Sequence, residues 1–363
     1  MYKTSNFNFR NNGDSILDKD NSLRIKKLKL LVVLYGVIII TIYILLNVDI
    51  NDSYDPFFKE QWNLNDSISG INAEKMWDYE KHYIQERPII IAIIDTGVDF
   101  NNKELEGRMW KGCGENSTHG QASVSFDSYH GTICAEIITA NHNSYGIEGI
   151  ASSLDLKIMS LKTLSSQNSV GGGSINSVIN AIKFAEDNGA HICNLSFGTD
   201  VNSPELYKAV SNSKMLFITS AGNATSFRGV NIDKAPYYPA SFNLENLISV
   251  TCIDKYSEFS KFVNYGKESV DIAAPGIDIP IVQYNGELGF VSGTSFAVPH
   301  VTGVAAVLYA FDKDLNACQC KKYICSTVQK KESLYNRCKT GGTIDGYSAL
   351  KTLMEFKKEG EKM

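Results

Sequence analysis

The sequence predicts an α/β protein of three layers, in which helices flank a mostly parallel central sheet and one transmembrane helix precedes the folded domain. Short apolar runs alternate along the chain with segments of helical spacing, a pattern typical of a parallel sheet covered by helices. The runs lack alternating polar positions, which indicates strands buried on both faces. A separate uncharged stretch near the amino terminus predicts the membrane span.

The overall composition is that of a folded protein without a nucleic-acid partner. Hydrophobic residues make up 43% and charged residues 21% of the 363 residues. The formal net charge is -5, and basic residues cluster only near the amino terminus, so no positive face is available to hold a phosphate backbone. The sequence does not predict the oligomeric state.

Residues 30–48 form the predicted span. They carry no charged side chain and, at about 1.5 Å per helical residue, reach roughly 28 Å, close to the thickness of a bilayer core. A buried soluble helix is one alternative, but it would need a core around every face. A cleaved signal peptide is the other, and the domain would then be secreted. The long leading segment and the lack of an Ala-x-Ala-like site before Asp49 favour an uncleaved anchor.

The charges on either side of the span predict its orientation. Basic residues gather at 24–29, whereas acidic residues dominate 49–60, so the amino terminus is expected in the cytoplasm and the folded domain outside. The predicted division is a polar and basic tail at 1–29, the anchor at 30–48, a linker at 49–60, the folded domain at 61–355 and a charged tail at 356–363.

Six apolar runs predict the strands of the central sheet, at 88–94, 154–161, 191–197, 215–221, 247–253 and 270–274. Helical spacing over 174–190 ends in Asn188-Gly189, a common stop signal. In such folds the functional side chains collect where parallel strands end. Residues at these strand ends are therefore the candidates for function.

Three chemically active side chains stand at predicted element ends. Asp95 closes the first strand, and Thr96-Gly97 turns the chain sharply away. His130 opens a helix predicted to run to about 140, and the small Gly131 leaves the imidazole room. Each residue alone could be structural, for example as a turn cap.

Ser295 lies at the first turn of the most hydrophobic helix of the domain. Pro299 is tolerated there because early helical positions need no backbone donor. The positive end of the helix favours an oxyanion nearby. A serine at a helix start is by itself usually only an N-cap.

Asp95, His130 and Ser295 follow one another in this order, with Asn223 in a Ser-Ala-Gly-Asn segment between the last two. Together these motifs resemble the signature of the subtilisin-like serine proteases, the subtilases. The resemblance extends from Gln61 to about 350 and includes the segments YYPASF at 237–242, VNYGKESVDIAAPG at 263–276 and GTSFAVPHVTG at 293–303.

The resemblance implies a serine endopeptidase whose catalytic residues are Asp95, His130, Ser295 and Asn223. Ser295 would attack the scissile carbonyl, while His130 takes and later returns the proton. Asp95 would hold the imidazole, and Asn223 would donate to the oxyanion. The principal alternative from another class is an inactive subtilase kept as a binding partner. General proteolysis and dedicated maturation of one substrate are not separated by the sequence.

The resemblance also implies that a protein or peptide substrate binds as an added strand between two edge segments. The expected substrate-binding residues are Gly171, Gly172, Gly173, Ser196, Phe197, Gly198 and Tyr237. A tyrosine at the base of the primary pocket predicts a preference for small or medium apolar residues on the acyl side of the cut bond. The glycine run could instead be a flexible surface turn, and Tyr237 could point into the core or to solvent.

A structural calcium ion is the expected cofactor, and the chemistry itself needs none. The loop at 141–147 resembles the calcium-binding loop of many subtilases, and oxygen ligands suit this ion. The expected ligands are Gln61, Glu104, Asn141, Asn143, Tyr145 and Ile147. The alternative is an Asn-rich loop that only hydrogen-bonds itself.

Three features near the motifs need separate comment. Glu136 stands where the family usually has a small residue, which raises a question about local packing. Cys134 resembles the free cysteine behind the histidine in the proteinase K branch. Of the eight cysteines, Cys193 and Cys252 are expected to be buried thiols. For Cys318, Cys320, Cys325 and Cys338, disulfides, thiols and a zinc site all stay open.

Overall fold

The structure is a computed structural model that describes residues 26–38, 54–65, 68–81, 83–112, 128–165, 172–224 and 228–360. The chain divides into two compact units, Met1–Ser53 and Tyr54–Met363. In the first unit, residues 26–38 are helical and largely exposed. The rest of the predicted membrane span, residues 39–48, lies outside the described residues. The second unit begins within the range 49–60 that the sequence predicts as a linker.

Helix α7, Thr294–Phe311, is the one described helix that is long and apolar enough to cross a membrane. Its apolar window is 89% buried inside the second unit, so it is the core helix of the folded domain. The sequence predicts this hydrophobic helix and its burial, and the structure confirms both.

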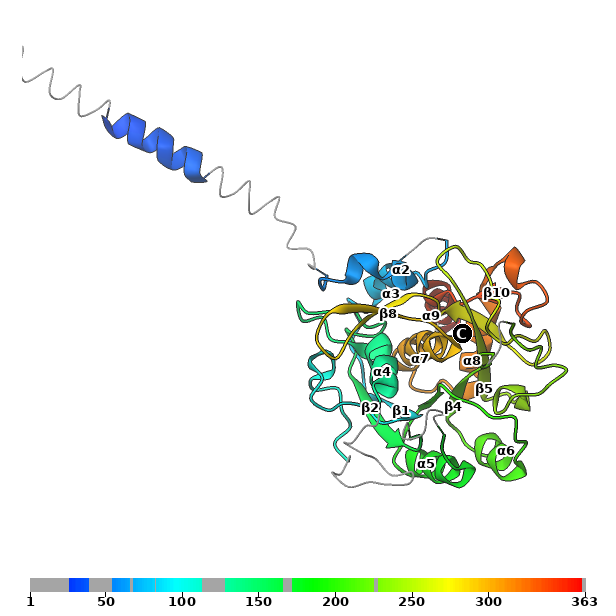
Figure 1. Ribbon diagram of the computed structural model, residues 1–363. Coiled ribbons are helices and arrows are strands. Elements are labelled where there is room, and N and C mark those ends of the chain that lie inside the picture. The colour runs from blue at the N-terminus through cyan, green and yellow to red at the C-terminus, as the bar shows by residue number, and fades with distance from the viewer. Residues whose placement is uncertain are drawn as a thin grey trace, which may run out of the picture. The chain divides into compact units, whose positions relative to one another are not determined.

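The second unit is built on a large sheet (Figure 1) with the strand order β2-β1-β3-β4-β5-β6-β10-β9. All neighbouring pairs run parallel except β9 and β10, which run antiparallel. The six predicted apolar runs become β1 to β6, and their burial confirms the prediction. The bounds are β1 Ile89–Asp95, β2 Leu156–Lys162, β3 Ile192–Leu195, β4 Leu216–Ser220, β5 Leu247–Ile253, β6 Ile272–Pro275, β9 Gln329–Lys330 and β10 Gly342–Thr343.

A separate antiparallel hairpin pairs β7, Ile279–Val282, with β8, Leu288–Val291. The sequence analysis does not specify this hairpin or the short strands β9 and β10. The remaining α-helices are α2 Trp62–Asn65, α3 Ala73–Glu80, α4 His130–Thr139, α5 Ile175–Asp187, α6 Pro204–Ser211, α8 Ala317–Ser326 and α9 Gly346–Gly360. Helix α5 matches the predicted 174–190 helix, and Gly189 after it has a φ of +76°, which agrees with the stop signal.

The sheet separates two apolar layers, and alternate residues of β1 show it. Ile91 and Ile93 pack in a cluster with α4 and α7, whereas Ala92 and Ile94 pack in another cluster with α5 and α6. Helices therefore cover both faces, as the prediction of three layers requires. Because both faces are covered, the carboxyl ends of the strands are the part of the sheet left open to a substrate.

Candidate active site

Asp95 and His130 form a hydrogen-bonded pair at the carboxyl edge of the sheet. His130 Nδ1 lies 2.8 Å from Asp95 Oδ1 and 3.0 Å from Asp95 Oδ2. The Asp95 side chain is fully buried, and its Oδ1 also accepts a hydrogen bond from Thr96 N at 2.7 Å. Because Asp95 is the last residue of β1, a rigid strand fixes the carboxylate that orients the imidazole.

His130 is the first residue of α4, as the sequence predicts. Its neighbour Gly131 lies against the turn that follows Asp95, and a Cβ there would approach Gly97 O to 2.3 Å. Any larger residue would push the helix start away from β1. The glycine therefore permits the close pairing of the imidazole with the carboxylate.

Two opposing effects act on the pKa of His130. Burial lowers it, because a charged imidazolium loses its hydration. The negative charge of Asp95 and the hydrogen bond that its carboxylate accepts from His130 raise the pKa, and together they prevail. The pKa of His130 therefore lies above its ordinary value of 6.5, and the imidazole becomes a stronger base than a free histidine.

Ser295 is the second residue of α7, which brings its hydroxyl to the same edge. The Ser295 Oγ donates a hydrogen bond to Ser196 O at 2.9 Å, and Ser196 Oγ donates to Ser295 O at 2.8 Å. The ring of His130 lies 5.3 Å from that of Phe296, centroid to centroid. The imidazole thus lies beside the first turn of α7, the turn that carries Ser295.

Asn223 follows β4 and is held by the residue before the serine. Its Oδ1 accepts hydrogen bonds from Thr294 N at 3.0 Å and from Thr294 Oγ1 at 3.1 Å. These bonds fix the amide plane, so Nδ2 faces the Gly293 turn, where an added Cβ would lie 3.1 Å from it. The amide N–H donors of Asn223 therefore point toward the start of α7. The sequence analysis did not identify Thr294 as the residue that orients this amide.

Tyr237 lies between two glycines at the same edge. A Cβ on Gly198 would come within 2.2 Å of Tyr237 Cε1, and a Cβ on Gly222 within 2.6 Å of the same atom. The ring position is fixed by the next residue, because Tyr238 pairs with Thr199 through two backbone hydrogen bonds of 2.7 and 2.8 Å. The Tyr237 ring therefore occupies the space between Gly198 and Gly222, next to Asn223.

The predicted glycine segment shows the alternation of an edge strand. Gly172 exchanges two backbone hydrogen bonds of 3.1 Å with Ser165. Because successive residues of an extended chain face opposite sides, Gly173 directs its backbone groups away from Ser165. A Cβ on Gly173 would lie 2.2 Å from Thr163 O, so a side chain has no room there. Gly171 lies outside the described residues.

The comparisons with known proteins agree with this geometry. The model of the subtilase family matches residues 86–342. The chain belongs to the subtilase family. Over 69% of its length it is 32% identical to a thermophilic serine proteinase of Bacillus sp. (strain AK1), of which it covers 61%. Over 70% of its length it is 34% identical to thermitase of Thermoactinomyces vulgaris, of which it covers 84%.

The fold is also that of solved proteases. A protease structure from Pseudoalteromonas arctica superposes with a TM-score of 0.67 at 21% sequence identity, over 84% of this chain and 100% of that chain. At this identity the likeness concerns the fold alone. It agrees with the mostly parallel sheet and flanking helices described above.

Within this subtilase, Glu136 is accommodated in the interior of α4. The side chain is fully buried, and its Oε1 accepts hydrogen bonds from Asn102 Nδ2 at 2.7 Å and from Tyr129 OH at 3.2 Å. Burial raises the pKa of Glu136 to about 8, so the carboxyl is mostly neutral at pH 7. The packing question raised by the sequence is thus answered by a buried polar network.

Cys134 lies directly behind the candidate active site. Its Sγ is 3.4 Å from Ser196 Oγ and 3.8 Å from Ser295 O. Burial raises the pKa of this thiol well above its ordinary range. The seven described cysteines are all free thiols, including Cys318, Cys320, Cys325 and Cys338, whereas Cys113 lies outside the described residues.

Two of the expected calcium ligands, Gln61 and Asn141, form hydrogen bonds within the protein. Gln61 Nε2 donates to Glu148 O at 2.9 Å, and Gln61 Oε1 accepts from Glu148 N at 2.8 Å. Asn141 Oδ1 accepts from Arg108 Nε at 2.6 Å, and Asn141 Nδ2 donates to Glu106 O. These two amides hold the loop in place through protein hydrogen bonds.

Glu104, in the 3-10 helix η2 (Lys103–Leu105), is the expected ligand that fits a cation best. Its side chain is fully buried, its Oε1 accepts from Ile147 N at 2.9 Å, and its Oε2 has no hydrogen-bond partner among the described residues. Burial raises the pKa of Glu104 to about 9. Asn143 Nδ2 donates to Lys103 O at 3.3 Å, and Tyr145 N donates to Asp55 Oδ1 at 3.2 Å. The sequence analysis did not include Asp55 in this region.

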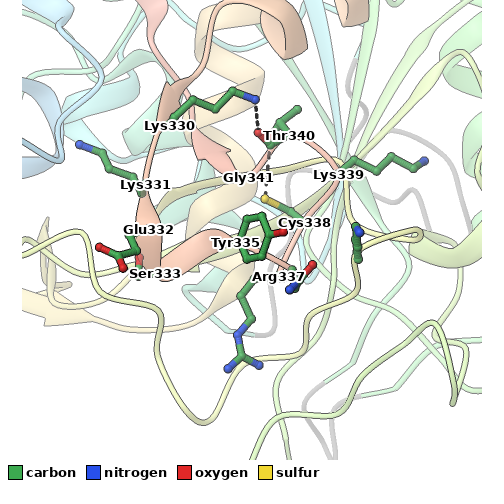
Figure 2. Close-up of a pocket in the computed structure, with 12 residues that line it drawn as sticks. Lys330, Lys331, Glu332, Ser333, Tyr335, Arg337, Cys338, Lys339, Thr340 and Gly341 are labelled. Atoms are coloured by element: carbon green, nitrogen blue, oxygen red, sulfur yellow. Dashed lines mark hydrogen bonds between the residues drawn. The ribbon is translucent and has the colours of Figure 1, made fainter.

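A basic hollow of about 840 Å³ lies between β9 and the segment before β10 (Figure 2). Most of its polar lining is already engaged within the protein. Lys330 Nζ donates to Thr340 O at 2.5 Å, and the Arg337 guanidinium lies 4.4 Å from the centre of the Tyr265 ring. The hollow contains none of the residues predicted for catalysis or substrate binding.

Proposed function

We propose that this subtilase is a serine endopeptidase that cuts peptide bonds through an acyl-enzyme on Ser295. The observation that carries the proposal is the bond of His130 Nδ1 to the buried Asp95 carboxylate, at 2.8 Å, beside the start of α7. The Asp95 bond occupies Nδ1, which leaves Nε2 as the nitrogen that can take a proton from the serine hydroxyl.

In the acylation step, Ser295 Oγ leaves its hydrogen bond to Ser196 O and attacks the substrate carbonyl carbon. His130 Nε2 takes the hydroxyl proton and then passes it to the leaving amine. Asp95 stays ionised and stabilises the imidazolium that forms between these transfers. A water molecule, activated by the same imidazole, then hydrolyses the acyl-enzyme.

The charge that develops on the carbonyl oxygen is met by Asn223 Nδ2 and the backbone amide of Ser295. The orientation of Asn223 by Thr294 supports this role, because a donor held in place costs no reorganisation during the reaction. The amino-terminal end of α7 adds a positive dipole at the same point.

The substrate is a protein or peptide that binds in extended form. Gly173, whose backbone groups face away from Ser165, forms one side of the added strand, and Ser196 to Gly198 form the other. The ring of Tyr237 between Gly198 and Gly222 supports a shallow primary pocket. Small or medium apolar residues are therefore the preferred residues on the acyl side of the cut bond.

The test compares the purified full-length wild type and three variants with peptide substrates and a serine-directed phosphonate probe. Ser295→Ala should lose peptide hydrolysis and labelling, and Asn223→Ala should lose about 100- to 1000-fold in kcat, the usual range for one oxyanion donor in this class of enzyme. Ser326→Ala, an exposed serine of α8, should keep both. An inactive wild type with intact folding would instead favour a binding protein.

The enzyme acts at the outer face of a membrane, anchored through residues 30–48. The uncharged span and the basic residues before it support this placement. Secretion after signal cleavage is the alternative. An anchor would restrict the enzyme to substrates near the membrane, whether it degrades many proteins or matures one.

Calcium is a structural ligand of the loop at 141–147. The unpartnered, buried Glu104 Oε2 supports a cation at this point, since an unpaired oxygen in the interior is costly. Glu104 with the loop oxygens of Asn143, Tyr145 and Ile147 would hold the ion. The ion would stabilise the loop without taking part in peptide hydrolysis.

A further inference from the structure

A second group of side chains of metal-binding types lies at the same loop. Asp55, His142 and Glu148 each offer one ligand atom, and these atoms lie within 4.8 Å of one another. Asp55 and Glu148 are each only 2% exposed, whereas the His142 side chain is 46% exposed. The cluster joins residues far apart in sequence and includes neither a residue of the candidate triad nor Glu104.

The hydrogen bonds of Glu148 and His142 define the centre of the cluster. His142 Nδ1 lies 2.7 Å from Glu148 Oε1, and Asp55 N donates to the same oxygen at 2.9 Å. The imidazole nitrogen and this carboxylate therefore share one proton. A cation can take the place of that proton.

Asp55 supplies a second and independent observation. Its Oδ1 accepts hydrogen bonds from Asn143 N at 3.1 Å and Tyr145 N at 3.2 Å. Its Oδ2 is buried and has no hydrogen-bond partner among the described residues. A carboxylate oxygen that is shielded from water without a donor is costly unless the group is protonated or meets a counter-charge. The surrounding protein fixes this carboxylate by one oxygen and leaves the other for a ligand.

We propose that Asp55, His142 and Glu148 form a binding site for a divalent cation of the zinc class. One imidazole nitrogen with two carboxylate oxygens is a donor set that zinc accepts, and three protein ligands leave the fourth position to water. Calcium and magnesium favour sites made of oxygen alone, so the nitrogen donor distinguishes this site from the loop around Glu104.

Binding would need the His142 and Glu148 donors to separate slightly. Zinc bonds of about 2.0–2.2 Å in a tetrahedral arrangement place two donor atoms roughly 3.4 Å apart. The His142 and Glu148 donors are now 2.7 Å apart, and the ligand atom of Asp55 lies within 4.8 Å of both. The shared proton leaves to solvent as the ion binds, so zinc uptake releases a proton.

An ion at this site would hold in place the segment around Asp55, where the folded domain begins. Asp55 precedes the 3-10 helix η1, Phe58–Glu60, whereas His142 and Glu148 belong to the loop after α4. An ion bridging them would cross-link the start of the domain to the loop that follows the helix carrying His130. The expected consequence is a higher resistance to unfolding in the presence of zinc.

The experiment measures zinc uptake by metal-free, full-length protein in detergent, using competition with a chromophoric chelator and cobalt(II) as a spectroscopic substitute. Wild type should bind one zinc ion at micromolar concentration and gain melting temperature. His142→Gln and Asp55→Asn should each weaken this binding at least about 10-fold, the usual minimum for a disturbed metal site. Glu104→Gln, the control for the calcium loop, should leave zinc binding unchanged.

Four outcomes would overturn the proposal. One is the absence of zinc binding in a wild type that melts cooperatively. Another is equal affinity in wild type and His142→Gln. The third is a cobalt spectrum with intense thiolate charge-transfer bands, which would assign the ion to cysteines. The fourth is displacement of zinc by equimolar calcium, which would assign the site to calcium. Equal melting temperatures of the metal-free variants exclude misfolding as the reason for lost binding.

Discussion

Replacing Tyr237 with glycine should change which peptide bonds this subtilase cuts. The ring now fills the space between Gly198 and Gly222, where added Cβ atoms would lie 2.2 and 2.6 Å from Tyr237 Cε1. Without the ring, this space is continuous with the edge that carries Asn223. A large aromatic side chain on the acyl side of the cut bond could then enter it.

The expected gain follows from the volume of the ring. A buried methylene group contributes about 0.8 kcal/mol, and changes of pocket volume usually alter discrimination by about 1–3 kcal/mol. At about 1.4 kcal/mol per factor of ten, this corresponds to a roughly 5- to 150-fold increase in kcat/KM for Phe peptides relative to Ala peptides. Tyr237→Gly should also cost stability, about 3 kcal/mol, because a half-buried ring is lost.

The assay compares kcat/KM for paired peptides that differ only in Phe or Ala at the acyl position. Because both values come from one enzyme preparation, loss of folded protein cancels in the ratio. Tyr237→Phe is the matched control, since it keeps the ring and should keep the preference for Ala. An unchanged ratio in Tyr237→Gly, or a preference of the wild type for Arg peptides, would refute the shallow pocket.

Four further predictions follow from the same structure. Activity should fall on the acid side with a midpoint above pH 6.5, because His130 has a raised pKa and is therefore protonated at a higher pH than a free histidine. Asp95→Asn should move this midpoint to lower pH and reduce kcat. Mercurials should inhibit wild type but not Cys134→Ala, since a metal on this sulfur would displace Ser295 and Ser196; equal sensitivity would show an inert thiol. Calcium chelation should lower the melting temperature of wild type but not of Glu104→Gln, and a wild-type melting curve indifferent to calcium would remove the site. External protease on intact cells should remove an epitope at residue 363 and spare one at residue 1, and the reverse pattern would contradict the orientation.

The sequence places the candidate triad residues at the ends of predicted elements for a physical reason. Buried parallel strands are recognisable from continuous apolar runs, and their carboxyl ends meet at one edge. Asp95 ends β1, Asn223 follows β4, and Ser295 begins the buried α7, so their convergence depends on topology rather than on side-chain detail. The hydrogen bonds of 2.8 and 3.0 Å between His130 and Asp95 follow from that arrangement.

The loop at 141–147 is less predictable, because its side chains can hydrogen-bond in several equivalent ways. Gln61 is a plausible oxygen ligand in the sequence, yet both ends of its amide pair with the Glu148 backbone. Asp55 lies in a stretch that reads as a polar linker, and only the packed chain reveals that it is buried. Which hydrogen bonds these side chains form depends on packing between segments far apart in the sequence. A local sequence pattern does not specify that packing.

Glu136 shows how a departure from a family pattern can be stable. A carboxyl group in the middle of α4 would be costly if it were charged, but its high pKa keeps it mostly neutral at pH 7. Asn102 and Tyr129 supply hydrogen bonds to one oxygen, and Tyr129 is the residue directly before His130. The same Asn102 accepts a bond from Glu104 N, so one amide links the segment Lys103–Leu105 to the helix of the candidate base. A change at Glu136 would therefore remove the hydrogen bond by which Asn102 contacts α4.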